Sequence, residues 1–396
     1  VTGVQTCALP IWHRMPRPAP SSFDLHMMGI ALRMARRGLG TTAPNPAVGA
    51  VIADEATGEI ISRGWTMPGG RPHAEPVAIA AAGERARGKT MYVTLEPCSH
   101  HGKTPPCADA ILDAGITRVV AALEDPDPRV SGRGLDRLRA AGVAVIRGVR
   151  AEEAHWLTRG HIVRVTERRP FTQLKVALDA AGEVPRGGGG APRFVTSPEA
   201  RAQGHLMRAE ADAIMVGAGT VRDDDPDLTC RLPGLASRSP LRVVLARDPA
   251  GFEKSRLAAT ARTVPVQLFT SIDALAEQQT LIAALLGLGV RADAVREVNG
   301  QLWLPTVLEN LAAQGITRLL VEGGPRLWQA FVRAGLYDEI VLFHAGGASH
   351  PAPAEAAARV ALTRAIGPFD ATLVTRRDIG GDDMLLFRRH PARVSR

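Results

Sequence analysis

Lysine is nearly absent from this chain of 396 residues, which carries 48 basic and 40 acidic side chains. Arginine supplies 44 (48 − 4) of the basic groups, because only four positions are lysine: Lys89, Lys103, Lys175 and Lys254. This bias, with abundant alanine, glycine and proline, is typical of a GC-rich genome, so the net charge of +8 does not itself indicate a nucleic-acid partner. Aromatic residues are also sparse and no long run of like charge occurs, so we expect no specific nucleic-acid binding.

Cysteine is scarce as well. The four cysteines, Cys7, Cys98, Cys107 and Cys230, are too few and too scattered for a disulfide framework, which favours a reducing cytoplasm. The longest apolar helical stretch, around residues 281–290, is much shorter than the roughly 20 residues that a membrane span needs. We therefore expect a folded cytoplasmic protein that neither crosses a membrane nor carries an export signal.

The opening residues, VTGVQTCALPIW, lack an initial methionine and show neither helical nor strand periodicity. They resemble a translated sequencing adapter. We interpret residues 1–20 as a non-native leader and leave them out of the fold prediction.

The length predicts two or three domains, of which we expect two. Residues 22–168 alternate between strand-like and helical patterns, which predicts an α/β domain with helices on both faces of one sheet. Residues 151–169 indicate a linking helix, and residues 169–392 predict a second α/β domain that ends in two strands around a turn at residues 380–382. The glycine run at residues 187–190 is most simply a loop, although a phosphate cradle is the alternative.

A possible metal site lies in the first domain. His73 and Glu75 open an apolar helix, and Cys98 and Cys107 follow at P-C and P-P-C segments. Three ligands, His73, Cys98 and Cys107, would leave one zinc position open for water, as catalytic zinc sites require. The H-x-E spacing makes Glu75 the proton carrier of a zinc deaminase.

Taken singly, each of these residues has a simpler explanation. His73 could cap the helix, and the two cysteines could be small core residues. Their order and spacing together favour zinc. However, eight residues separate the cysteines instead of the two of the simplest deaminase signature, so the chain must make an excursion between the ligands.

That excursion, Ser99 to Pro106, resembles the bifunctional deaminase/reductase family of riboflavin biosynthesis. Further matches are the segments Asn45 to Gly49, His73 to Glu75 and Asp125 to Pro128, with Val130, Gly132 and Gly134 after them. The resemblance implies a cytidine-deaminase-like first domain in which Asn45 contacts the pyrimidine. It also implies that His100 and His101 do not bind zinc, although both are possible rival ligands.

The second domain gives weaker signals of its own. Gly217-Ala218-Gly219 lacks the third glycine of a dinucleotide fingerprint. The turn at residues 322–325 precedes a helix with proline at its first position, so it suits either phosphate binding or plain strand-to-helix connection.

The resemblance continues from residue 171 to about residue 389 and implies a dihydrofolate-reductase-like fold that uses NADPH. It assigns four residues to the phosphorylated substrate: Arg208, Leu228, Arg231 and Glu322. It assigns eleven to NADPH: Ala177, Phe194, Thr220, Asp224, Gly324, Pro325, Arg326, Leu327, Trp328, Gln329 and Ala330. Plain surface roles for the two arginines remain an alternative. The sequence departs from the family at Asp179, Ala181, Phe194 and Arg247, which bears on individual reductase contacts.

The resemblance implies two consecutive reactions: zinc-dependent hydrolytic deamination of a diamino-ribosylamino-pyrimidinone 5′-phosphate, then NADPH-dependent reduction of the ribosyl group to ribityl. Its substrates are small phosphorylated pyrimidines, and we expect a homo-oligomer. The alternatives are a single-activity nucleoside or tRNA deaminase with a non-catalytic second domain, and a basic nucleic-acid-binding protein with a structural zinc. The structural-zinc alternative needs a fourth protein ligand and gives Glu75 no role.

Overall fold

The computed structural model describes residues 19–100, 105–128, 130–185, 195–346 and 355–389. Cys7, His101, the glycine run at 187–190 and Phe194 lie outside the described residues, as do residues 1–18 of the predicted leader. Predictions that depend on those positions stay predictions.

The first part of the chain forms a five-stranded sheet in the order β2-β1-β3-β4-β5. Its strands are β1 (Gly49–Ala53), β2 (Ile60–Trp65), β3 (Thr90–Val93), β4 (Arg118–Ala121) and β5 (Ala144–Arg147). Strand β1 is antiparallel to β2 and β3, whereas β3, β4 and β5 run parallel. Strands β1 and β3 are buried along their whole length, as expected for a sheet covered on both faces.

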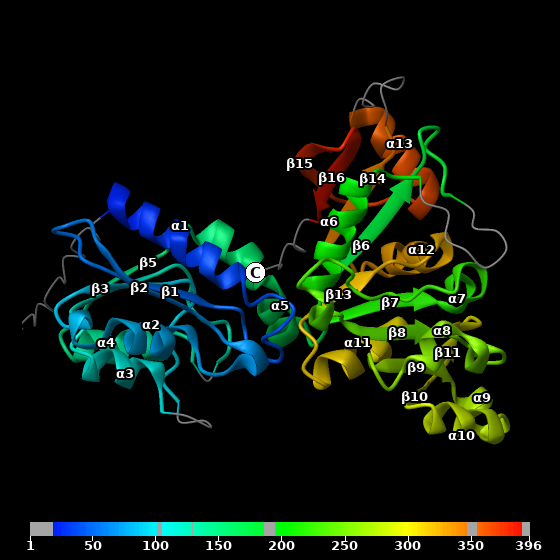
Figure 1. Ribbon diagram of the computed structural model, residues 1–396, viewed down its shortest axis with the longest axis horizontal. Helices are drawn as coiled ribbons and strands as arrows, with labels where there is room; N and C mark the ends of the chain where they lie inside the picture. The colour runs from blue at the N-terminus through cyan, green and yellow to red at the C-terminus, as the bar shows by residue number, and fades with distance from the viewer. Residues whose placement is uncertain (1–18, 101–104, 129, 186–194, 347–354, 390–396) are drawn as a thin grey trace, which may run out of the picture.

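Helices cover both faces of this sheet, so the predicted three-layer arrangement is correct (Figure 1). Helices α1 (Ser22–Arg36) and α5 (Ala151–Glu167) share one apolar core with the sheet. Helices α2 (Ala74–Ala82), α3 (Cys107–Asp113) and α4 (Arg133–Ala140) pack in a second core on the opposite face. Short 3₁₀ turns lie before and after α2, at Pro68–Gly70 and Gly83–Ala86.

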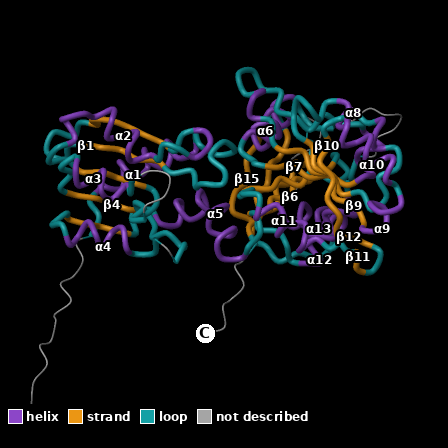
Figure 2. The backbone as a smooth tube through the Cα atoms, turned by 90° about the horizontal axis from the view of Figure 1, so that it is seen from below, coloured by secondary structure: helices purple, strands orange, loops and turns teal. Residues whose placement is uncertain are grey.

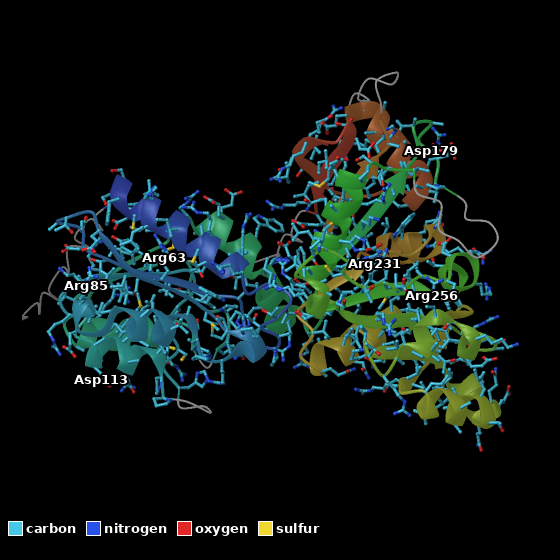
Figure 3. The ribbon with its side chains drawn as sticks, in the orientation of Figure 1. Arg63, Arg85, Asp113, Asp179, Arg231 and Arg256 are labelled. Atoms are coloured by element: carbon cyan, nitrogen blue, oxygen red, sulfur yellow. The ribbon has the colours of Figure 1, made fainter. Side chains whose placement is uncertain are left out.

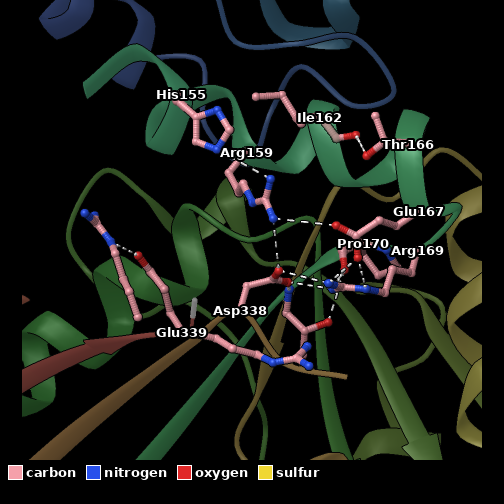
Figure 4. A network of polar contacts seen from close by, with 12 residues as sticks. His155, Arg159, Ile162, Thr166, Glu167, Arg169, Pro170, Asp338 and Glu339 are labelled. Carbon is pink, nitrogen blue, oxygen red and sulfur yellow. Dashed lines mark hydrogen bonds and ion pairs between the residues drawn. The ribbon is translucent and has the colours of Figure 1, made fainter. Parts of the chain in front are cut away.

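Helix α5 is the predicted linking helix, and the two sheets lie on either side of it (Figure 2). Its end is fixed by a buried ion pair, since Arg169 donates to the two carboxylate oxygens of Asp338 at 2.6 and 2.9 Å (Figure 4). Asp338 also accepts the backbone N–H of Thr172 at 2.8 Å. The chain is thereby held where it leaves the helix and enters the second sheet.

The second sheet has nine strands in the order β10-β9-β8-β7-β13-β6-β14-β16-β15. Strands from β10 to β14 in this order run parallel; β16 is antiparallel to β14, and the edge strand β15 is antiparallel to β16. The strands are β6 (Phe171–Leu178), β7 (Ala213–Gly217), β8 (Leu241–Leu245), β9 (Val266–Ser271), β10 (Val290–Val295), β13 (Arg318–Val321), β14 (Glu339–His344), β15 (Thr372–Ile379) and β16 (Asp382–Arg388). A separate small hairpin pairs β11 (Glu297–Val298) with β12 (Gln301–Leu302).

Helices again cover both faces. One core gathers α6 (Pro198–Ala209), α7 (Ala218–Asp224), α8 (Arg256–Ala259) and α10 (Gln279–Gly287). The other gathers α11 (Leu304–Ala313), α12 (Pro325–Ala334) and α13 (Glu355–Ile366). Helix α9 (Ile272–Glu277) and 3₁₀ turns at Ala236–Arg238 and Phe252–Lys254 complete the described elements.

The sequence pattern missed several of these elements. Strand β10 lies at an edge of the sheet and alternates apolar and polar residues, as strands do, but it directly follows an apolar helical stretch and was missed for that reason. The alanine-rich α13 and the short α7 were also missed. Within the described residues, no helix is both long and apolar enough to cross a membrane.

Candidate active sites

His73, Cys98 and Cys107 come together in the first half, and one potential ligand atom from each lies within 4.8 Å of the others. Nδ1 of His73 is 3.8 Å from the sulfur of Cys98 and 3.3 Å from that of Cys107. A tetrahedral zinc with bonds of about 2.3 Å to sulfur and about 2.05 Å to nitrogen would separate these atoms by roughly 3.6 Å. The three side chains therefore fit zinc, and His100 is not part of the cluster.

Two of these three side chains lie at the N-termini of helices. His73 is the N-cap residue of α2, and Cys107 is the first residue of α3, as predicted. The backbone N–H of Cys107 donates to the sulfur of Cys98 at 3.3 Å. Amide hydrogens at a helix N-terminus favour negative charge, so the fold stabilises a thiolate at Cys98.

Two ionisable groups of the cluster have strongly shifted pKa values. A hydrogen bond from the Cys107 side chain, helped by His73, lowers the pKa of Cys98 to about 4. Burial raises the pKa of Glu75 to about 7, although the charge of His73 opposes the shift. Glu75 is only 3% exposed and lies in the first turn of α2, beside the ligands but outside the ligand set.

Asn45 lies on a loop that contacts the segment leading to His73. Its side-chain N–H donates to the backbone oxygen of Gly70 at 2.7 Å. Gly70 has a positive φ of 81°, and a Cβ there would come within 2.8 Å of the Asn45 side chain. Glycine at this position therefore permits the close contact between the two loops.

A second site is a cavity of about 430 Å³ over the carboxyl ends of the parallel strands β6, β7 and β13, where open α/β sheets usually bind ligands. Its lining includes all four predicted substrate residues: Arg208, Leu228, Arg231 and Glu322. Arg231, labelled in Figure 3, lies near α6, and its side chain is 48% exposed.

Arg208 is already engaged within the protein. Its guanidinium donates to both carboxylate oxygens of Glu322, at 2.8 and 2.9 Å, and to the backbone oxygen of Thr229 at 3.0 Å. Lys175 adds its ammonium group 3.6 Å from Glu322. Burial alone would raise the pKa of Glu322, but these two cations outweigh it and lower that pKa to about 2.

A neighbouring cavity of about 560 Å³ shares Thr220 and Asp224 with the first. Its lining includes five of the predicted cofactor residues: Thr220, Asp224, Gly324, Pro325 and Gln329. Ala177 lines the first cavity. The other predicted cofactor residues on α12 line neither cavity: Arg326, Leu327, Trp328 and Ala330. Of these, Trp328 is buried in the apolar core between the helices and the sheet.

The sequence pattern did not single out His205, which also lines the cavity that holds the predicted substrate residues. The signal was present, because His205 and Arg208 are three residues apart and so share one face of α6. The sequence pattern also gave Lys175 no role in a site. Its contact with Glu322 makes it part of the charged group in this cavity.

Comparison with known protein families matches both halves. The family described as the cytidine and deoxycytidylate deaminase zinc-binding region matches residues 21–123, and the RibD C-terminal domain matches residues 171–348. The riboflavin biosynthesis protein RibD of Aquifex aeolicus is 39% identical over 81% of this chain and 86% of its own length. That of Escherichia coli is 39% identical over 81% of this chain and 87% of its own length.

Solved structures agree with these relatives. RibD of Acinetobacter baumannii superimposes with a TM-score of 0.76 at 31% identity, covering 93% of this chain and 99% of that one. A diaminohydroxyphosphoribosylaminopyrimidine deaminase/5-amino-6-(5-phosphoribosylamino)uracil reductase of Thermotoga maritima gives the same score at 32% identity and the same coverage.

The predicted fold class and the prediction of a two-activity enzyme are confirmed, and the single-activity alternative is not supported. The matching families indicate that the first half is a zinc-binding deaminase and that the second half is a reductase with a nicotinamide cofactor. The chain belongs to the RibD family, the bifunctional deaminase–reductases of riboflavin biosynthesis.

Proposed function

We propose that residues 22–168 deaminate 2,5-diamino-6-ribosylamino-4(3H)-pyrimidinone 5′-phosphate, here called the diamino substrate. Residues 169–392 then reduce the product, 5-amino-6-(5-phosphoribosylamino)uracil, to its ribityl form. The observation that carries the first step is the cluster of His73, Cys98 and Cys107 beside the buried Glu75. The name of the Thermotoga maritima protein supports the choice of substrates.

In the deamination, His73, Cys98 and Cys107 hold the metal, and zinc when bound supplies hydroxide near neutral pH. Glu75 takes a proton from the attacking water at its carboxylate and delivers it to the departing ring amine. Its burial excludes bulk water from this transfer. Asn45 positions the pyrimidine from the opposite loop.

In the reduction, hydride transfer is the cofactor's own chemistry, and the protein supplies binding and orientation. Arg231 is the better candidate for a direct phosphate contact, because its side chain is half exposed and only loosely paired with Asp227 at 3.7 Å. Arg208 instead holds Glu322 at the base of the cavity. Thr220, Asp224 and the start of α12, which line the neighbouring cavity, would hold the cofactor.

NADPH is the proposed form of the cofactor, on the strength of the family resemblance in residues 171–389. Steady-state rates with NADPH and with NADH, each at saturating deaminated substrate, test this choice. A preference for NADH would overturn it. We further propose that the protein acts in the cytoplasm as a homo-oligomer on small phosphorylated pyrimidines.

A coupled assay tests the whole proposal. The full chain loaded with zinc should release ammonia from the diamino substrate and, when NADPH is added, oxidise NADPH after that release. Ammonia release without any NADPH oxidation would mean that the departures at Asp179, Ala181, Phe194 and Arg247 have disabled the reductase.

A further inference from the structure

The segment of residues 125–132 that follows β4 lies beside the metal-ligand segment. We call it the Asp125 loop; residue 129 is outside the described part. Strands β3 and β4 are parallel, with Val93 paired to Ala121, so the loop and Cys98 leave the same edge of the sheet. Contact with the ligand segment continues into α4, since a Cβ at Gly134 would lie 1.9 Å from the backbone oxygen of Pro97.

Glu96, two residues before Cys98, holds this loop from the zinc side. Its carboxylate accepts four backbone N–H groups, from Asp125 at 3.2 Å, Gly132 at 2.9 Å, Gly134 at 2.8 Å and Leu135 at 3.3 Å. Glu96 is buried at 4% exposure, so these donors take the place of water around a buried carboxylate. The loop and the Cys98 segment are therefore fixed relative to one another.

A second anchor comes from outside the first sheet. Nε2 of His161, on the linking helix α5, lies 3.0 Å from a carboxylate oxygen of Asp125. The same oxygen accepts the backbone N–H of Asp127 at 2.9 Å. Both side chains are about 10% exposed, so the contact is shielded from water and from screening by salt.

The linking helix is held by the second half of the chain. Nε of Arg164 donates to the backbone oxygen of Ala312 at 3.0 Å, and Arg318 donates to the backbone oxygens of Trp156 and Leu157 at 3.3 Å. The helix thus contacts the reductase half through Arg164 and Arg318 and the deaminase half through His161.

His161 is among the residues that line a small cavity between the two halves, and its Nδ1 atom is buried. That atom and the hydroxyl of Thr158 are buried and have no hydrogen-bond partner within the described residues. Both residues line the cavity with Thr42, Pro46, Asp212 and Arg318, and it offers about 10 Å³ to the centre of a water molecule. One water there would satisfy both atoms and leave Nε2–H of His161 to donate to Asp125.

We propose that His161 is a positioning residue of the deaminase. Its hydrogen bond to Asp125 fixes the Asp125 loop beside the zinc ligands, so the linking helix completes the deaminase site. This inference rests on the proposed roles of His73, Cys98 and Cys107. Zinc content and ammonia release of the unchanged protein test those roles separately.

The experiment compares full-length His161→Leu and His161→Gln with the unchanged protein. Leucine removes the donor, whereas glutamine retains an N–H that reaches the same carboxylate. His155→Leu is the matched control, because His155 is on the same helix but contacts Trp156 and Arg159 instead of the deaminase half. For each protein, kcat and KM of ammonia release, NADPH oxidation with deaminated substrate, zinc per chain and amide exchange in residues 122–135 are measured.

For His161→Leu we expect a fall of about tenfold or more in kcat/KM of ammonia release and faster amide exchange in the Asp125 loop. Zinc content and NADPH oxidation should not change. His161→Gln should recover at least half of the lost rate, and in an Asp125→Ala background, which lacks the acceptor, the leucine variant should cost little more. The proposal is overturned if His161→Leu stays within twofold of the unchanged protein, if both activities fall together, or if glutamine does not rescue.

Discussion

Two buried glutamates show how single residues are adjusted to different tasks. Glu75 and Glu322 are both nearly inaccessible to solvent, at 3% and, for the side chain, 8% exposure. Burial dominates at Glu75 and raises its pKa to about 7, whereas Arg208 and Lys175 outweigh burial at Glu322 and lower its pKa to about 2. One carboxyl is thereby suited to carrying a proton, and the other remains a fixed negative charge.

The three proposed zinc ligands can be tested one residue at a time. Cys98→Ala and Cys107→Ala should each retain less than about a tenth of the zinc, because two protein ligands hold this metal poorly. Cys230→Ala is the control, since Cys230 is buried in the second half and outside the ligand cluster. Metal analysis of purified full-length proteins gives the answer. Full zinc in both ligand variants would show that the metal is bound elsewhere.

Arg208 and Arg231 should differ in what their removal does. Arg231→Ala should raise the KM of the reductase by about 10- to 100-fold and leave stability unchanged, as expected for loss of a charge-assisted phosphate contact. Arg208→Ala should lower the free energy of unfolding by about 3 to 5 kcal/mol, because it leaves Glu322 buried with a weaker partner. Steady-state kinetics and urea unfolding separate the two effects. Equal stability of both variants would contradict a structural role for the Arg208–Glu322 ion pair.

At the scale of helices and strands, the position of the candidate metal site is set by the first residues of α2 and α3. His73 caps α2 and Cys107 opens α3, and the N-terminus of each helix faces the cluster. These starts were predictable, because H-A-E and P-P-C open apolar helical patterns. The turn at residues 322–325 was also placed correctly between β13 and α12. Local sequence determines such boundaries, so it reveals them.

Other features could not be predicted because they depend on distant partners. The pairing of Arg208 with Glu322 joins residues 114 positions apart, and that of His161 with Asp125 joins residues 36 apart. Nothing in the local pattern distinguishes Arg208 from the other arginines of an arginine-rich chain. The family resemblance implied a substrate contact for Arg208, which stays a prediction; its pairing with the buried carboxylate of Glu322 is seen only in the fold.

The contact between α6 and the end of β13 should make stability depend on pH. The lowered pKa of Glu322 means that its ionised form stabilises the fold above about pH 4.5, and this contribution is lost as the pH falls toward 2. Compared with Glu322→Gln, the unchanged protein should be more stable by about 2 to 4 kcal/mol at pH 7, and the difference should fall by about half at pH 3.

Urea unfolding of both proteins at pH 7, 4 and 3, followed by the transition of the second half, measures this difference. A gap that stays constant over that range would show that Glu322 is not held ionised by Arg208 and Lys175.

At the scale of the whole molecule, helix α5 joins two sheets that each present a site at the carboxyl ends of parallel strands (Figure 1). The ends of β3 and β4 lead to the proposed zinc ligands and the Asp125 loop, and the ends of β6, β7 and β13 surround the second cavity. The buried ion pair of Arg169 with Asp338 fixes the end of α5 to the second sheet (Figure 4). In the proposed function, these two sites catalyse separate, consecutive reactions.

Glu75→Gln in the full chain tests that claim most directly, because the amide preserves shape but cannot carry a proton. Cys230→Ala serves as the matched control. The Gln variant should keep its zinc, release ammonia from the diamino substrate at least 1,000-fold more slowly, and oxidise NADPH at the normal rate with 5-amino-6-(5-phosphoribosylamino)uracil. With the diamino substrate it should oxidise almost no NADPH, because a pocket that hydrogen-bonds the ring carbonyl disfavours an amine. Near-normal ammonia release, or rapid NADPH oxidation with the diamino substrate, would contradict the account.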